Sequence, residues 1–496
     1  MFGAPPPRIR YRPGVKCGTL THRTFLRGRS MKNAFAAAAL LSCGAAAFAQ
    51  SGDPARAAFL EIYREMVEID SSPSTGSCTR VVQAAQKRLE AAGYAGDEVQ
   101  LVIPDGKPED GNLVARLRAP ASQKKGVLLL AHIDVVDAKR ADWERDPFKL
   151  VEENGFFYGR GAVDDKAMAA VFLDLMIRLK QERAFRPKRD LVLALTCGEE
   201  TSNRVNGVDY LLQNRRELID AAFAINEGAG GLLSPDGQKP LVLQVQAGEK
   251  IHQVYSLTVT NPGGHSSRPV PDNAIYRLAR ASLEVEQLQF PLELTPVVRE
   301  YFRVTGPTLG GQIGAAMTAV GKNPDDRAAL ATLTADPSYN NLLHTTCVAT
   351  QLEAGHAPNA LPQSAKAILS CRVMQGTTPE QVKEALDKAI GDDQVKVEIV
   401  RRRNGSKPPE LNDEVMKPVR AAAAKLWPGV PIAPSMTAGA TDGRFLMSAG
   451  IPTYGMSGMF AVSGENNAHG LNEKIRVKSL YEGREFLERI VRAYVK

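Results

Sequence analysis

Hydrophobic residues recur three and four positions apart in AAFLEIYREMVEI (57–69) and RVVQAAQKRLEAAG (80–93), which predicts two amphipathic helices. Strand-like, mostly apolar runs follow at 112–117, 126–131, 190–197 and 221–226. Helical patterns at 166–182 and 207–218 separate the last three runs. Strands that alternate with helices predict an α/β fold with a mixed, largely parallel sheet flanked by helices.

The pattern changes near Gly248, where strands and helices follow each other in a different order. Strand-like runs lie at 252–260, 345–355, 364–373 and 394–403, and helical patterns lie at 272–286 and 379–390. This order predicts a smaller α+β domain of the β-α-β-β-α-β type at 250–405, which interrupts a larger domain made of 50–249 and 406–496. Residues 291–343 show no pattern that we can assign.

The formal net charge of +7 originates in the first 49 residues. This leader contains no acidic residue and eight basic ones: Arg8, Arg10, Arg12, Lys16, Arg23, Arg27, Arg29 and Lys32. Subtracting these eight charges from +7 leaves −1 for the rest of the chain. A nearly neutral body argues against nucleic acid or a membrane surface as a partner.

Residues 1–49 have the features of a leader that contains a signal peptide. From Met31, the alternative start of the chain, MKNAFAAAALLSCGAAAFAQ has a basic beginning, a short alanine-rich apolar run and an A-x-A pattern at 47–49. The apolar run is too short to span a membrane. We therefore expect a secreted or periplasmic protein, with lipidation at Cys43 as the alternative.

Four cysteines remain after removal of the leader: Cys78, Cys197, Cys347 and Cys371. Their spacing matches neither a zinc ribbon nor a C-x-x-C redox pair. Export permits disulfides, and Cys347 and Cys371 lie on two strand-like runs that could form a hairpin. Four free buried thiols are the alternative.

Several predicted strands end in imidazole or carboxylate side chains. His132 and Asp134 follow the run at 126–131, and Glu199, Glu200 and Glu227 follow two other runs. Glycine-rich polar loops add three more such residues: Asp164, Asp165 and His469. A cluster of acids repels itself without cations, and His and carboxylate ligands suit zinc, so we expect two Zn²⁺ ions bridged by one carboxylate.

These motifs, in this order, resemble the co-catalytic zinc peptidase family of carboxypeptidase G, aminoacylase-1, carnosinases, Gly-X carboxypeptidase and succinyl-diaminopimelate desuccinylase. The resemblance covers nearly all of the chain after the leader. It implies that His132 binds one zinc ion, that Asp164 bridges both, and that Glu200 and His469 bind the other. It further implies that Glu199 is the general base and that Asp134 orients His132.

One ligand position departs from the commonest family pattern. Aminoacylase-like members end this strand in Asp-Glu-Gly and use the Asp, whereas this chain has Asn226-Glu227-Gly228. A carboxamide oxygen is a poor zinc ligand, and members that end the strand in Gly-Glu-Pro use the glutamate. We therefore expect Glu227 to be the ligand, with a weakened site that often holds a single zinc ion as the alternative.

The inserted domain also resembles its counterpart in the family, a lid and dimerisation domain. NPGGHSSRP supplies His265, which is implied to stabilise the tetrahedral intermediate, often across the interface of a homodimer. GHAPNALPQSAKAILSCR supplies Asn359 and Arg372, and GATDGRFL supplies Arg444, as candidates for binding a substrate carboxylate. No function is assigned to His22, His252, His344 or His356.

Taken with the leader, the resemblance implies an exported zinc metallohydrolase that cleaves an amide bond next to a free carboxylate in peptides, as carboxypeptidases and dipeptidases do. The alternative activity is hydrolysis of N-acyl amino acids by the same centre. A non-catalytic binding protein with this fold would be expected to lose Glu199 or a ligand, and Glu199 is present.

Overall fold

The computed structural model describes residues 53–496 except 121, 202, 403–404 and 406–407. The predicted leader, with Cys43, lies outside these residues. Within the described part of the chain, no helix has the length and apolar character needed to cross a membrane.

The helices are α1 (Pro54–Glu68), α2 (Cys78–Ala91), α3 (Lys166–Gln181), α4 (Gly207–Asn214), α5 (Arg216–Ile219), α6 (Ala274–Gln287), α7 (Pro296–Leu309), α8 (Gly311–Lys322), α9 (Arg327–Thr334), α10 (Pro337–Leu343), α11 (Pro379–Ile390), α12 (Asp413–Leu426), α13 (Gly443–Ser448) and α14 (Val477–Tyr494).

The largest sheet has ten strands: β1 (Val99–Val102), β2 (Asn112–Leu117), β3 (Val127–His132), β6 (Leu191–Thr196), β7 (Phe223–Asn226), β8 (Gly231–Leu233), β9 (Pro240–Glu249), β16 (Ile432–Thr437), β17 (Thr453–Gly455) and β18 (Phe460–Ala461). Their order is β1-β2-β6-β3-β7-β17-β9-β8-β18, and β16 also pairs with β9. At the centre, β6, β3, β7 and β17 are parallel neighbours. The predicted mixed, largely parallel sheet is confirmed.

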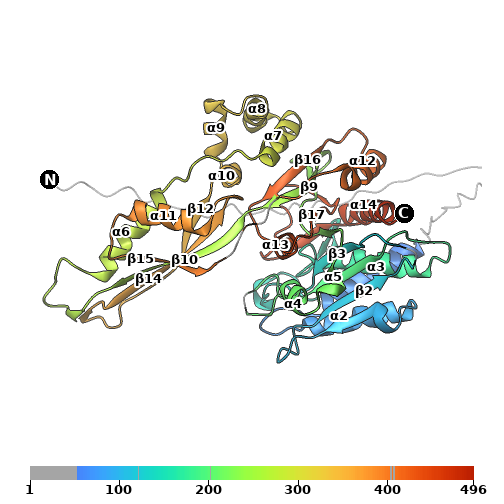
Figure 1. The fold of residues 1–496 in the computed structure, drawn as a ribbon, viewed down its shortest axis with the longest axis horizontal. Coiled ribbons are helices and arrows are strands. Elements are labelled where there is room, and N and C mark those ends of the chain that lie inside the picture. The colour runs from blue at the N-terminus through green and yellow to red at the C-terminus, as the bar shows by residue number, and fades with distance from the viewer. Residues whose placement is uncertain (1–52, 121, 202, 403–404, 406–407) are drawn as a thin grey trace, which may run out of the picture. The chain divides into compact units, whose positions relative to one another are not determined.

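Helices bury both faces of this sheet. In β3, Leu129 packs into the hydrophobic cluster that includes α1, α2, α3, α12 and α14. Leu128 and Leu130 belong to the cluster on the other face, with α4, α5 and α13. Figure 1 shows α2 and α3 along this sheet. Burial on both faces explains why β3 is an unbroken apolar run rather than an alternating one.

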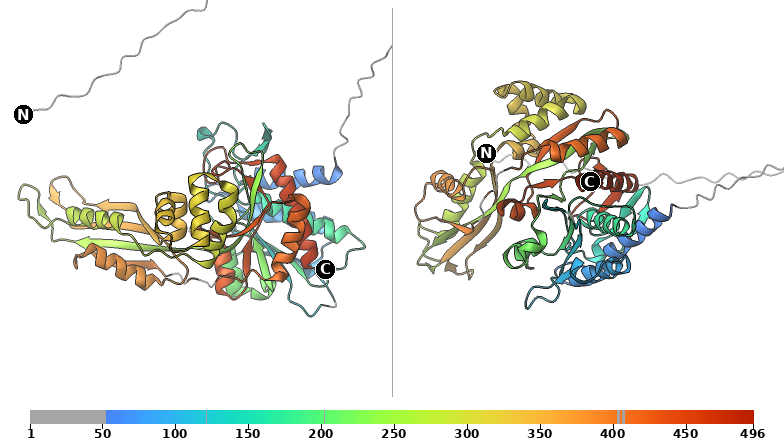
Figure 2. Two further views of the ribbon diagram at one scale, coloured as in Figure 1. Left: turned by 90° about the horizontal axis from the view of Figure 1, so that it is seen from above. Right: turned by 45° about the vertical axis from the view of Figure 1, so that its right-hand side comes forward.

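A second sheet has four antiparallel strands: β10 (Ile251–Thr260), β12 (Thr346–Ala354), β14 (Ser364–Val373) and β15 (Lys396–Arg401). The strand order is β12-β14-β10-β15, and α6 and α11 pack on the sheet in one shared core. Figures 1 and 2 show both helices beside these strands. The chain order is therefore the predicted β-α-β-β-α-β, while the domain boundaries at 249/250 and 405/406 stay predictions.

The unassigned segment 291–343 is helical. Helices α7 to α10 pack around Phe302, Met317 and Leu333, in a cluster that also includes Met374 after β14 and Met436 of β16. Two small sheets complete the fold: β19 (Lys474–Arg476), β5 (Phe156–Tyr158) and β4 (Val151–Glu153), and the pair β11 (Gly264–His265) and β13 (Ala360–Leu361).

All four described cysteines form disulfides. Cys347 and Cys371 are direct partners in the β12–β14 ladder and are bonded to each other, as their strand positions suggested. Cys78 is bonded to Cys197, a pair that the sequence did not indicate. The alternative of free thiols is therefore wrong, because the fold brings the first residue of α2 to the end of β6.

Candidate metal centre and active site

Three parallel strands deliver the predicted site residues to one edge of the large sheet. The neighbours β6, β3 and β7 end at Thr196, His132 and Asn226. Glu199 and Glu200 follow β6, and Glu227 follows β7. Because the carboxyl ends of parallel strands meet at the same edge, side chains from distant parts of the sequence come together there.

Asp164 lies between two imidazoles. Its Oδ1 is 3.1 Å from His132 Nε2, and its Oδ2 is 3.0 Å from His469 Nε2. Asp164 precedes α3, whereas His469 lies in the loop between β18 and β19. One carboxylate with an oxygen toward each imidazole is the arrangement expected of a ligand that bridges two metal ions.

Each imidazole also faces a second carboxylate. Glu227 Oε2 is 3.7 Å from His132 Nε2, and Glu200 Oε2 is 2.9 Å from His469 Nε2. Ligand atoms of His132, Asp164 and Glu200 all lie within 4.8 Å of one another, and so do those of His132, Glu199 and Glu227. Imidazole nitrogens and carboxylate oxygens are donors that zinc accepts, so this cluster fits the implied metal.

The electrostatics of the cluster also fit bound cations. Burial raises the pKa of Glu227 and Glu199, and neighbouring acids raise it further. Burial opposes the charged form of His132, but Glu227 and Asp134 outweigh it and raise the pKa of this imidazole. Hydrogen bonds with Asp164 and Glu200 raise the pKa of His469 to about 10. The acids thus attract positive charge strongly in a poorly hydrated place.

Asp134 contacts His132, as predicted, and also contacts the loop that carries Glu199 and Glu200. Its Oδ1 is 3.6 Å from His132 Nδ1, while the backbone oxygen of Asp134 is closer, at 3.1 Å. Its carboxylate accepts hydrogen bonds from the backbone N–H groups of Glu199 at 3.3 Å and Glu200 at 3.0 Å. Asp134 therefore links the strand end that carries His132 to the loop that carries the two glutamates.

Arg160 and Glu473 support the cluster, although the sequence gave no reason to select them. Arg160 Nη1 is 2.8 Å from Glu473 Oε2, and both side chains are almost completely buried. Glu473 accepts the backbone N–H of Asp164, and Arg160 donates to the backbone oxygen of Gly470, next to His469. The pair joins the two loops that carry these metal-ligand candidates.

Of the predicted substrate-binding arginines, Arg444 in α13 lies closest to the cluster, with Nη1 3.8 Å from Glu199 Oε1. Burial lowers the pKa of Arg372, and the nearby Arg444 lowers it further, whereas Glu199 acts in the opposite direction. Among the described residues, no carboxylate forms an ion pair with Arg372. Arg444 thus lies at the cluster, and Arg372 is near enough to Arg444 and Glu199 for their charges to shift its pKa.

His265 ends β11 and Asn359 directly precedes β13, the strand paired with β11, and both residues are exposed. His265 Nδ1 accepts the backbone N–H of Ser267, and the backbone oxygen of Asn359 accepts the N–H of Ser266. Within the described part of one chain, no hydrogen bond or ion pair joins either residue to the carboxylate cluster.

Comparison with known proteins agrees with this geometry. The model of peptidase family M20/M25/M40 matches residues 128–493. The human N-fatty-acyl-amino acid synthase/hydrolase PM20D1 is 28% identical over 367 residues, covering 71% of this chain and 70% of that protein.

Two solved structures share the fold. The M20 family metallo-carboxypeptidase Sso-CP2 of Sulfolobus solfataricus has a TM-score of 0.65 at 22% identity, covering 88% of this chain and 99% of its own. Human carnosine dipeptidase 1 has a TM-score of 0.62 at 15% identity, covering 89% of this chain and 97% of its own. The resemblance inferred from the motifs is therefore confirmed.

Proposed function

Because the chain belongs to peptidase family M20/M25/M40 and is a hydrolytic enzyme, we propose that it cleaves an amide bond next to a free carboxylate in peptides. The activity would be that of a carboxypeptidase or dipeptidase. The observation that carries this proposal is the Arg444 guanidinium, 3.8 Å from Glu199, with Arg372 near enough to both residues for their charges to shift its pKa. Arg372 has no carboxylate partner among the described residues, and a guanidinium of this kind suits the carboxylate of a substrate.

Two zinc ions would be held at this site, one by His132 and Glu227 and the other by His469 and Glu200, with Asp164 shared. The distances from Asp164 and the two outer glutamates to the imidazoles support this assignment. When bound, such ions lower the pKa of a water molecule and polarise a carbonyl group.

Glu199 is suited to move the proton. Its carboxylate lies at the cluster, and burial raises its pKa, which makes it a stronger base than an exposed glutamate. We assign it the proton of the attacking water, which it then delivers to the leaving amine. Asp134 keeps Glu199 in place through the backbone of the loop.

A second candidate activity is hydrolysis of N-acyl amino acids. A cavity of about 390 Å³ adjoins Asp164 and Glu227. Its wall includes the apolar side chains of Met168, Leu232, Met459, Phe460, Val462 and Ile475. Such a wall would accept an apolar acyl group as well as an apolar amino-acid side chain, and the human relative is named for fatty-acyl substrates.

A substrate series separates these activities. Leucyl-phenylalanine, N-lauroyl-phenylalanine and N-acetyl-phenylalanine would be compared at equal concentration, together with the amides that lack a free carboxylate. We expect cleavage only of compounds with the carboxylate. A higher kcat/KM for the dipeptide supports the peptidase, a higher value for the lauroyl compound supports the acyl alternative, and equal cleavage of the amides contradicts both.

The Glu199→Gln variant tests the mechanism because it keeps the size of the side chain and removes the proton acceptor. We expect normal metal content and a fall in kcat of about 10²–10⁴-fold. Glu61→Gln, at an exposed position on α1, is the matched control and should change neither the metal content nor kcat. Loss of a metal ion, or a fall below about tenfold, would show that Glu199 is not the base.

We also propose a homodimer and export by the leader. The edge strand β12 exposes Val348 and Leu352, and the neighbouring α6 exposes Tyr276 and Leu283. An unpaired edge strand beside exposed apolar side chains supports pairing with a second copy. The signal-peptide pattern supports a secreted or periplasmic location, with a lipoprotein as the alternative.

A further inference from the structure

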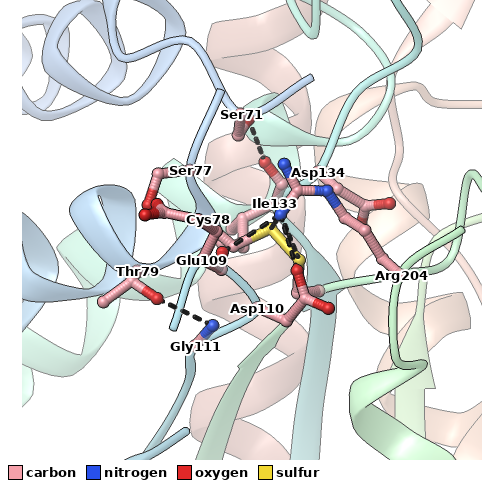
Figure 3. The surroundings of a disulfide bond; sticks show 12 residues. Ser71, Ser77, Cys78, Thr79, Glu109, Asp110, Gly111, Ile133, Asp134 and Arg204 are labelled. Atoms are coloured by element: carbon pink, nitrogen blue, oxygen red, sulfur yellow. Dashed lines mark hydrogen bonds and ion pairs between the residues drawn. A yellow bond between two sulfur atoms is a disulfide. The ribbon is translucent and has the colours of Figure 1, made fainter. Parts of the chain in front are cut away.

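The loop that carries Glu199 and Glu200 begins at a disulfide. Cys197 directly follows β6 and is bonded to Cys78, the first residue of α2, across 119 positions of the sequence. Both cysteines are completely buried, and Figure 3 shows the surroundings of the bond. The beginning of this loop is therefore covalently fixed two residues before Glu199.

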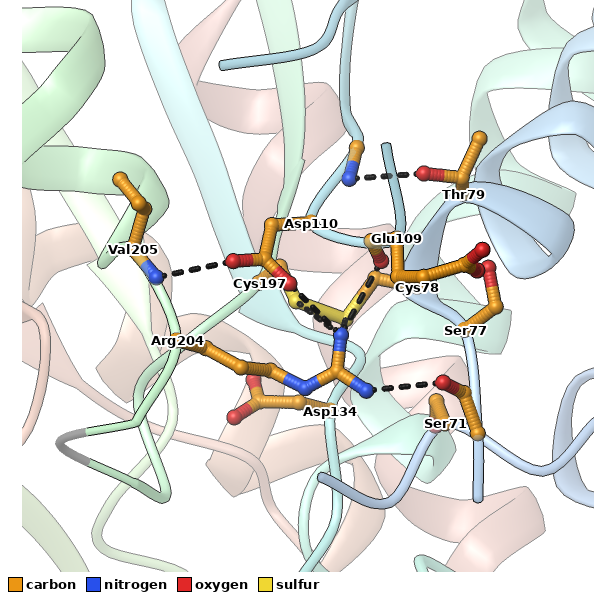
Figure 4. Close-up of polar contacts among 12 residues, drawn as sticks. Ser71, Ser77, Cys78, Thr79, Glu109, Asp110, Asp134, Cys197, Arg204 and Val205 are labelled. Atoms are coloured by element: carbon orange, nitrogen blue, oxygen red, sulfur yellow. Dashed lines mark hydrogen bonds and ion pairs between the residues drawn. A yellow bond between two sulfur atoms is a disulfide. The ribbon is translucent and has the colours of Figure 1, made fainter. Parts of the chain in front are cut away.

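The other end of the same loop is fixed by Arg204. Its guanidinium Nη1 is 2.8 Å from Asp110 Oδ1 (Figure 4). Its Nη2 donates to the backbone oxygens of Ser72 at 2.6 Å and Gly76 at 2.9 Å. The second oxygen of Asp110 accepts the backbone N–H of Val205 at 3.0 Å. A buried ion pair with this many hydrogen bonds fixes the geometry of the chain around it.

Between these two anchors, Asp134 holds the backbone of Glu199 and Glu200 by two hydrogen bonds. Hydrogen bonds of this kind constrain a loop much less than a covalent bond does. Release of Cys197 from α2 would therefore leave the backbone of the two glutamates held by hydrogen bonds alone, which allow more movement relative to His132 and Asp164.

The two anchors are also in contact with each other. Arg204 Nη1 is 3.9 Å from Cys78 Sγ and 3.8 Å from Cys197 Sγ. The same Nη1 is 2.8 Å from Asp110 Oδ1, so one guanidinium nitrogen contacts both the disulfide and the ion pair. A change at the disulfide would therefore also alter the surroundings of the Arg204–Asp110 pair.

We propose that the Cys78–Cys197 disulfide, together with the Arg204–Asp110 pair, positions Glu199 and Glu200, so that catalysis requires the oxidised chain. These residues act through the two glutamates and are positioning residues. The inference rests on the proposed function for its kinetic test, but its metal-binding test is independent of the substrate.

The second disulfide provides a matched control. Cys347–Cys371 links β12 and β14 in the four-stranded sheet, and no hydrogen bond or ion pair between described residues joins it to the loop that carries Glu199 and Glu200. Removal of either disulfide should lower stability, because both restrict the unfolded chain. Only removal of Cys78–Cys197 should change the position of Glu199.

The test compares Cys78→Ala/Cys197→Ala with Cys347→Ala/Cys371→Ala, after circular dichroism has shown that each is folded. For the first variant we expect kcat to fall about tenfold or more and KM to stay within about twofold. Its affinity for one of two Zn²⁺ ions, titrated calorimetrically into the metal-free protein, should also fall. The second variant should keep kcat and both metal affinities.

Unchanged zinc affinities and kcat in the folded first variant would overturn the proposal. Equal losses in both variants would also overturn it, because they would reflect stability alone. If the unmodified protein cleaves none of the substrates, the proposed function fails, and the zinc titration still decides the inference.

A reversible experiment on the unmodified chain covers the case in which the first variant does not fold. The protein would be reduced with a phosphine, freed of reductant and metal under argon, and titrated with zinc. We expect the reduced protein to lose its affinity for one zinc ion and to regain it after reoxidation. The number of free thiols, counted at each stage, should rise on reduction and fall on reoxidation. Retained affinity with both bonds reduced would contradict the proposal.

Discussion

Adjacent side chains at the end of β7 have different surroundings. Asn226 is buried, and its Nδ2 donates to Thr441 Oγ1 at 3.1 Å. Glu227 instead reaches the cluster, with its Oε2 3.7 Å from His132 Nε2. Because successive residues of a strand point to opposite sides, only one of the two can face His132, and in this structure it is the glutamate.

Metal content therefore distinguishes the two residues. Glu227→Ala should release one of two bound ions and reduce activity sharply, because it removes an anionic ligand. Asn226→Ala should retain both ions and lose some stability, since it leaves the buried Thr441 with one partner fewer. Mass spectrometric metal analysis after gel filtration measures this, and the reverse pattern would assign the ligand to Asn226.

Sequence reasoning found the residues whose position follows from local pattern. Glu199, Glu200 and Glu227 directly follow apolar strands, so their convergence at one sheet edge could be predicted. Arg160, Glu473 and Arg204 could not be found in this way, because charged residues in loops are usually exposed. Their burial results from contacts between segments far apart in the chain.

At the scale of elements, the Arg160–Glu473 pair joins the loop before α3 to the loop before β19. Arg160→Met should cost about 3–5 kcal/mol, because it leaves a buried carboxylate without its partner. The exposed pair Arg489–Glu485 is the control, and Arg489→Met should cost at most about 1 kcal/mol. Urea unfolding at constant metal content measures both, and equal costs would refute a structural function for the buried pair.

Helices α7 and α8 show why the segment 291–343 was not assigned. Their glycines resemble loop signals, yet they allow close contact between the two helices. A Cβ atom at Gly306 would lie 2.7 Å from the backbone nitrogen of Thr318, and one at Gly321 would lie 2.7 Å from Arg303 Cα. Glycine here serves packing between helices, which a local pattern does not reveal.

At the scale of the whole molecule, one chain does not bring all of the predicted catalytic residues together. His265 is exposed in the β11–β13 ribbon and bonded to Ser267, without a contact to the cluster among the described residues. Asn359 directly precedes β13 of the same ribbon. A histidine that assists catalysis from this position would have to reach the cluster of a second copy or move within its own chain.

Mixing two inactive variants separates these possibilities. His265→Ala and Glu199→Ala would be combined under conditions in which labelled subunits exchange. If His265 serves the partner's site, each mixed dimer has one site that contains both native residues, so activity should recover to about a quarter of the unmodified level, since about half of randomly formed dimers are mixed. Confirmed exchange without recovery would mean that His265 acts within its own chain or takes no part in catalysis.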